Sequence, residues 1–183
     1  ELGSSLPPPP ALALGSAFGS MLLGATSMAR TLLAVGAVPL GAFGAWRLSR
    51  RISRRGWPVA AAALVYGVNP LPRNALAAGR LGPLVLFALA PFVLSGLLRL
   101  AGYCDDPYAR RWRGVVGNGA LVAVTAAAWP LAIAFPLLVV GALALAAPFA
   151  RDSFGRVMRG VGAAFLVTGV ALVLLMPWPL GYL

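Results

Sequence analysis

The chain has 183 residues, of which 60% are hydrophobic and 10% are charged, and its mean hydropathy is +0.87. These values exclude an ordinary soluble domain, because too few polar side chains are present to cover a surface that faces water. All 15 basic residues are arginines, and the formal net charge is +11. The arginines form short clusters between apolar runs, a pattern that favours membrane lipids, and not nucleic acid, as partners.

The apolar runs are too long for barrel strands and lack their alternation, so we expect helices, which satisfy the backbone within lipid. The predicted fold is all-α: a polytopic transmembrane helix bundle of about six spans plus one interfacial or re-entrant helix. Residues 1–10 form an extended, proline-rich lead-in, and residues 11–183 form a single transmembrane helical domain. Because the chain does not begin with methionine, we expect it to be a fragment or a processed form of a larger protein.

The first half of the domain contains one uncertain segment and three predicted spans. Residues 11–28 are apolar but rich in glycine, serine and threonine, and their pattern fits a span or a re-entrant or interfacial helix. Residues 31–46 form a span that ends at Trp46 and precedes an arginine cluster. Residues 57–68 form a short span that ends at the sequence NPLP, residues 69–72, and residues 83–98 form the next span after a polar stretch.

The second half contains three more predicted spans. Residues 115–150 carry no charge and are too long for one crossing of about 20 residues. We therefore predict two spans that meet at Trp129-Pro130, with further kinks at Pro136 and Pro148. The last span covers residues 161–176.

The arginines are distributed unevenly between the two sides of these spans. The loops 47–55, 99–113 and 151–159 lie on one side and hold five, four and three arginines, whereas the other side holds three. By the positive-inside rule we expect these arginine-rich loops to be cytoplasmic.

Small residues recur at intervals of four in two of the spans. One set is Ala37, Gly41 and Ala45, and the other is Gly160, Ala164 and Thr168. Such faces let helices approach closely in lipid, so we expect them to pack within the bundle.

No catalytic or metal-binding motif is evident. Histidine is absent, and the predicted span interiors contain no ionisable group of the kind that proton transfer within a membrane needs. Cys104 beside Asp105 and Asp106 is a poor zinc shell, so we expect a plain loop there, no metal and no cofactor. The catalytic residue, if the chain belongs to an enzyme, is unknown.

The candidate binding residues lie on the side that is poor in arginine. They are Arg30, Arg73 and Arg80, with Asn74 as an additional hydrogen-bond donor. Guanidinium groups beside proline-rich backbone at membrane depth could bind a lipid phosphate bidentately. The alternative is that they are ordinary interfacial arginines whose charged ends reach the headgroups.

Several segments resemble the membrane region of large actinobacterial glycosyltransferases, in which a family 2 glycosyltransferase domain precedes many spans. They are residues 2–24 (LGSSLPPPPALALGSAFGSMLLG), 31–50 (TLLAVGAVPLGAFGAWRLSR), 65–94 (VYGVNPLPRNALAAGRLGPLVLFALAPFVL) and 174–180 (LLMPWPL). That region in turn resembles the GT-C fold of arabinofuranosyltransferases, which use decaprenyl-phosphate sugars.

The resemblance implies a multi-pass protein of the bacterial plasma membrane that acts in the cell envelope with a polyprenyl-phosphate sugar donor. The chain would be the membrane segment of a hexosyl- or pentosyltransferase and would supply the scaffold and the lipid-phosphate pocket. The family's catalytic acid has no match here, so that acid would lie outside this stretch. Two alternatives remain: a non-catalytic subunit of a larger membrane complex, and a transporter or flippase, against which the absence of charges within the spans argues.

Overall fold

The computed structural model describes residues 26–53, 55–103, 111–148 and 154–176, and all regular structure in these ranges is helical. This confirms the predicted all-α class for the described residues. The elements in chain order are α2 (Thr26–Ile52), α3 (Gly56–Gly67), α4 (Pro70–Ala77), α5 (Leu81–Ala101), α6 (Arg111–Ala128), the 3-10 helix η1 (Pro130–Ala134), α7 (Phe135–Ala146) and α8 (Phe154–Leu175).

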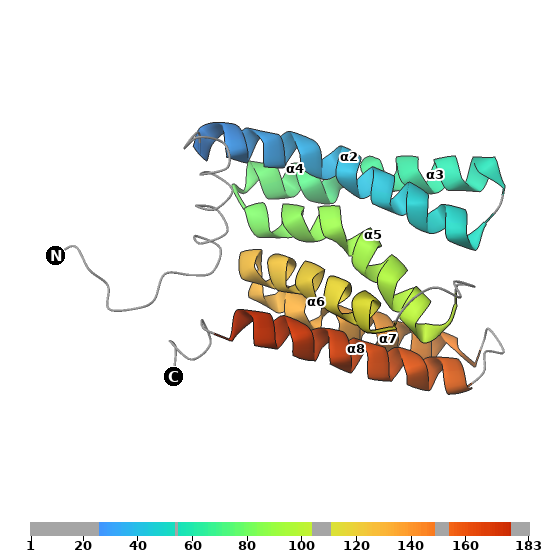
Figure 1. Ribbon diagram of the computed structural model, residues 1–183. Coiled ribbons are helices and arrows are strands. Elements are labelled where there is room, and N and C mark those ends of the chain that lie inside the picture. The colour runs from blue at the N-terminus through green and yellow to red at the C-terminus, as the bar shows by residue number, and fades with distance from the viewer. Residues whose placement is uncertain (1–25, 54, 104–110, 149–153, 177–183) are drawn as a thin grey trace.

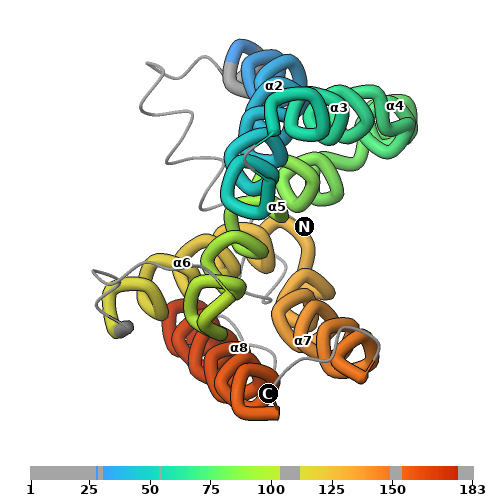
Figure 2. Tube along the Cα trace, turned by 90° about the vertical axis from the view of Figure 1, so that its right-hand side faces the viewer, coloured from blue at the N-terminus to red at the C-terminus, as the bar shows by residue number. Residues whose placement is uncertain are grey.

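The helices form two groups that share α5. Helices α2 and α4 pack on α5 in the first group, with α3 against α2, while α6 and α8 pack on α5 in the second, with α7 against α8. Successive crossings run antiparallel, and Figure 2 shows the two groups on either side of α5. Helix α5 contains Pro91 and bends on its way from one group to the other (Figure 1), as expected where a proline interrupts the helical hydrogen bonds.

Helix α3 compensates for the proline in α5. Pro91 has no N–H to donate to the carbonyl of Phe87, four residues earlier in the helix. The Tyr66 hydroxyl from α3 donates to that carbonyl oxygen instead, at 2.7 Å. The two aromatic rings also stack, with centroids 4.4 Å apart. The bend in α5 is therefore stabilised by a contact with another helix.

Both predicted small-residue faces pack within the bundle, as expected. Ala37, Gly41 and Ala45 are buried, and a Cβ added at Gly41 would lie 2.8 Å from a ring carbon of Phe87. On α8, Gly160 and Ala164 are buried and Thr168 is half-buried. A Cβ added at Gly160 would lie 3.4 Å from the Cβ of Ala101 in α5. Small side chains thus set the close approach of α2 and α8 to α5.

The buried core has one cluster in each group. The cluster of the first group consists of Ala37, Ala75, Leu84 and Ala88. The cluster of the second group is larger and centres on fully buried side chains of α5, α6 and α8, among them Leu97, Val122 and Val167.

Among the described residues, three helices are long and apolar enough to cross a membrane: Thr31–Ile52, Leu81–Ala101 and Phe154–Leu175. Pro130–Ala146 is a shorter apolar stretch. Large apolar side chains cover much of the outer surface as well; Leu64, Val65 and Val68 around the end of α3 are 67%, 74% and 81% exposed. A surface of this kind favours lipid over water as its solvent.

Two predicted breaks are confirmed, with one change at the first. Helix α3 ends just before Asn69, but the chain resumes a helix at Pro70, because the Asn69 side chain accepts from the Leu71 N–H at 2.9 Å and proline is tolerated in a first turn. The predicted polar stretch is therefore partly helical. Figure 1 shows that α3 and α4 follow one another alongside α2. Together they carry the chain back toward the end of the bundle at which α2 begins. At the second break, Trp129 is extended between α6 and η1.

The predicted kinks and loops differ from the structure in three respects. Pro136 lies in the first turn of α7, where proline fits without a kink, and Pro148 follows the end of that helix. The arginine-rich segments are not simply loops: α2 continues to Ile52, α6 begins at Arg111 and α8 begins at Phe154. Arginine is a good helix former, and its long side chain can reach away from the helix. A helix can therefore include arginines that lie beyond its apolar sequence.

Some predictions fall outside the described residues. These are the lead-in at 1–10, the segment 11–28 up to residue 25, the loop with Cys104 and its two aspartates, and the end of the chain from residue 177.

Candidate functional site

The described arginines of all three predicted clusters lie at one end of the bundle. Helices α2 and α5 end there, and α6 and α8 begin there (Figure 1). A guanidinium nitrogen of Arg159 in α8 lies 3.0 Å from the place that a Cβ on Gly102 would take, and Arg156 lies over the Tyr103 ring at 5.6 Å. We call this the arginine end.

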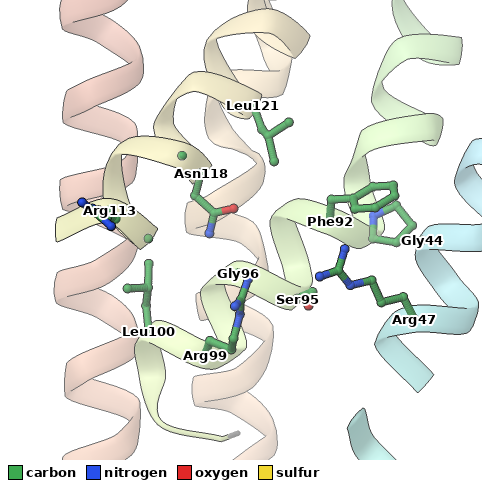
Figure 3. A pocket seen from close by; sticks show the side chains of 13 residues that line it. Gly44, Arg47, Phe92, Ser95, Gly96, Arg99, Leu100, Arg113, Asn118 and Leu121 are labelled. Atoms are coloured by element: carbon green, nitrogen blue, oxygen red, sulfur yellow. The ribbon is translucent and has the colours of Figure 1, made fainter. Parts of the chain in front are cut away.

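A cavity of about 820 Å³ opens between α2, α5 and α6 at the arginine end. Arg47 from α2, Arg99 from α5 and Arg113 from α6 line it, and we call it the arginine cavity. Figure 3 shows the Arg47 side chain reaching from α2 toward α5, with Asn118 extending from α6 on the other side. Three cationic side chains from three helices therefore belong to one lining.

Glycines are frequent in the lining of the arginine cavity. Gly44, Gly96, Gly114 and Gly117 all belong to its lining. Gly44 also brings α2 close to α5, since a Cβ there would lie 2.7 Å from the ring of Phe92. Gly96 lets the Asn118 side chain lie directly against the backbone of α5, because a Cβ at Gly96 would collide with the Asn118 amide.

Asn118 is the exceptional polar residue of the arginine cavity. Its side chain is only 5% exposed, and its Nδ2 amide nitrogen has no hydrogen-bond partner. It lies seven residues after the start of α6, which is about 10 Å along a helix. An unpaired buried amide costs about 1–3 kcal/mol, so such a group calls for a partner.

The predicted binding residues at the opposite end are only partly brought together. Asn74 and Arg80 line one hollow of about 390 Å³ beside α4, and Arg80 also lines a second hollow of about 420 Å³ with Thr31 of α2. Arg73 is exposed and lines neither hollow. Arg30 belongs to α2, but its side chain is not among those that the structure describes. Whether these residues bind a lipid phosphate stays a prediction.

The sequence pattern did not reveal the arginine cavity. It indicated a role in topology alone for the arginines at positions 47, 99 and 113. The missed signal was the sequence Gly117-Asn118-Gly119, a polar amide between two glycines near the start of an apolar run. Gly119 permits a close approach of α8, since a Cβ there would lie 2.5 Å from Val170, and Asn118 beside it is buried between α6 and α5.

No titratable cluster suggests hydrolytic or metal chemistry in the described ranges. None of the four acidic residues lies in them, and no group of three or more metal-binding side chains occurs in that part of the chain. The predicted absence of a site at Cys104, Asp105 and Asp106 concerns residues outside these ranges.

Fold and site together define a class: a helical protein with membrane-length apolar helices and an arginine-lined cavity between three of its helices. No protein-family model matches the sequence, and no curated protein or solved structure matches it.

Proposed function

We propose that the chain is the membrane-embedded part of a cell-envelope glycosyltransferase that uses polyprenyl-phosphate sugar donors. In this proposal the six crossings are α2, α3 with α4, α5, α6, η1 with α7, and α8, in a GT-C-like bundle in a bacterial plasma membrane. The arginine end then faces the cytoplasm. The chain supplies the scaffold and a lipid-phosphate pocket, and the catalytic acid comes from another part of the enzyme.

The observation that carries the proposal is the broken crossing formed by α3 and α4. It places Asn74 and Arg80 in one hollow at the end opposite the arginine end, beside the Asn69-Pro70 break. Irregular backbone at membrane depth is typical of sites that bind a polar group. An arginine and an amide there match a phosphate that is delivered by a lipid. The sequence resemblance supplies the sugar-donor class.

The test is binding of undecaprenyl phosphate to the purified chain in phosphatidylcholine nanodiscs. We expect Arg80→Ala to weaken binding by about tenfold, because a charge-assisted hydrogen bond is lost. Arg50→Ala, at the arginine end and outside every cavity described above, is the matched control and should bind normally. Normal binding by a folded Arg73→Ala/Arg80→Ala double variant would refute the pocket.

A non-catalytic subunit of a larger membrane complex is the second candidate. It is favoured by the lack, within the described ranges, of any acid or histidine that could act as a general acid or base. The coding sequence around this chain separates the two candidates. A glycosyltransferase domain in the same reading frame supports the first, and a separate short gene beside genes for a membrane complex supports the second.

A further inference from the structure

We propose that the arginine cavity binds a phosphate group, presented either by an anionic lipid of the adjacent leaflet or by a soluble phosphate anion. The site is separate from the hollow that contains Asn74 and Arg80, and it lies at the other end of the bundle. The inference does not depend on the glycosyltransferase proposal, because it rests on the cavity alone.

The charge of the lining selects an anion. Arg47, Arg99 and Arg113 come from three different helices, and the described residues contribute no carboxylate to the lining. Guanidinium groups present paired N–H donors that match phosphate oxygens. Arginines in the last turn of a helix also complement the helix dipole, which would explain Arg99 in α5 but not Arg47, which precedes the last turn of α2. That role does not explain Arg113, which lies in the first turn of α6.

The first turn of α6 itself favours an anion. Arg113 and Gly114 both line the cavity there, and the N-terminal turn of a helix carries partial positive charge on its amide groups.

Asn118 supplies the second, independent observation. Its amide nitrogen is a buried donor without an acceptor, and the side chain belongs to the lining of the cavity. Figure 3 shows it extending from α6 toward the space above Arg99 and Gly96. The amide packs against Gly96 at the wall of the cavity, and rotation of the amide group would present its N–H donors to a phosphate oxygen.

The dimensions of the cavity suit a phosphate with part of its ester substituent. Its volume of about 820 Å³ lies within the common range for small-molecule pockets, about 300–1,000 Å³. A bare phosphate would leave much of this space to water, whereas a lipid headgroup would fill more of it. The two sources share the same recognition chemistry and differ in how much of the cavity they occupy.

The experiment is a calorimetric titration of the purified chain, in nanodiscs of uncharged phosphatidylcholine, with dioctanoyl phosphatidic acid. We expect saturable binding with one ligand per chain. Arg47→Gln, Arg113→Gln and Asn118→Ala should each weaken it by about tenfold, because each removes a charge-assisted hydrogen bond. Competition with inorganic phosphate then assigns the source: displacement at millimolar phosphate indicates a soluble anion, and resistance indicates a lipid headgroup.

Two controls separate a site from general surface charge. Arg50→Gln removes a charge at the same end of α2, where Arg50 lies over the Trp46 ring at 4.9 Å and does not line the cavity. It should leave binding within about twofold, because screening weakens a charge that makes no contact with the ligand. Gly117→Phe leaves every charge in place and should block binding, because a Cβ at Gly117 would meet no atom within 4 Å and the ring can occupy the cavity. Gly169→Phe on α8, with equally open surroundings, is its control.

Equal loss of affinity in Arg47→Gln and Arg50→Gln, or full binding by folded Gly117→Phe, would overturn the inference. Arg80→Ala should leave phosphatidic acid binding at the arginine cavity intact. If undecaprenyl phosphate binding fails to respond to Arg80→Ala while phosphatidic acid binding responds to Arg47→Gln, the proposed function loses its pocket and the arginine cavity stands.

Discussion

The hydrogen bond from Tyr66 to the carbonyl of Phe87 gives a quantitative test of how α5 tolerates its proline. In Tyr66→Phe the carbonyl loses the 2.7 Å bond, and Pro91 offers no N–H in its place. Phe87 is only 5% exposed, so water does not readily replace the donor. An interhelical bond within a membrane contributes about 1 kcal/mol, and a buried unpaired carbonyl adds to its loss. We expect Tyr66→Phe to lower the free energy of unfolding by about 1–2 kcal/mol.

Pro91→Ala makes this prediction specific. Alanine at position 91 restores the N–H that the Phe87 carbonyl needs, so Tyr66→Phe should cost about 0.5 kcal/mol or less in that background. The coupling in the double-mutant cycle is then about 1 kcal/mol. The control is the same cycle with Pro39→Ala, since Pro39 lies inside α2 and is exposed. That cycle should show no coupling.

The assay is reversible unfolding in mixed micelles, driven by dodecyl sulfate and followed by circular dichroism. An equal cost of Tyr66→Phe with and without Pro91 would refute the reasoning, because the hydroxyl would then not be compensating for the proline.

Two further predictions concern packing and charge. Gly41→Ala should destabilise the bundle by about 1–3 kcal/mol, because its Cβ would lie 2.8 Å from Phe87 and 3.0 Å from Tyr66. The control is Gly36→Ala, whose Cβ would meet no atom within 4 Å. In the same unfolding assay, it should be neutral or stabilising. Equal effects of the two substitutions would contradict the packing of α2 on α5. Asp105→Asn/Asp106→Asn, which removes two negative charges between Arg99 and Arg113 in the sequence, should tighten phosphatidic acid binding in the titration above, and weaker binding would contradict the anion site.

Hydropathy predicted the helical class and the main breaks because these depend on local sequence. The break at Trp129 follows from a run that is too long for one crossing, and small residues such as Gly41 identify a packed face through their spacing alone. Helix ends were less predictable, because a helix can extend beyond its apolar sequence. Helix α8, for example, begins at Phe154, within an arginine-rich segment.

The arginine cavity could not be predicted because it depends on which helices become neighbours. Arg47 and Arg113 are 66 positions apart, and nothing in their local sequence shows that α2 and α6 border the same space beside α5. The same applies to Tyr66, whose role follows from its contact with Phe87 and not from its own neighbours.

The central claim is that the apolar helices cross a membrane with the arginine end on one side. Cysteine labelling tests it directly, in a Cys104→Ser background, with Ile52→Cys and Phe154→Cys at the arginine end and Ala78→Cys at the opposite end. A membrane-impermeant maleimide should label the Ala78→Cys protein in intact bacteria, and the other two proteins only after the cells are permeabilised. Labelling of Ile52→Cys and Phe154→Cys from opposite faces, or of all three from the same face, would contradict the account.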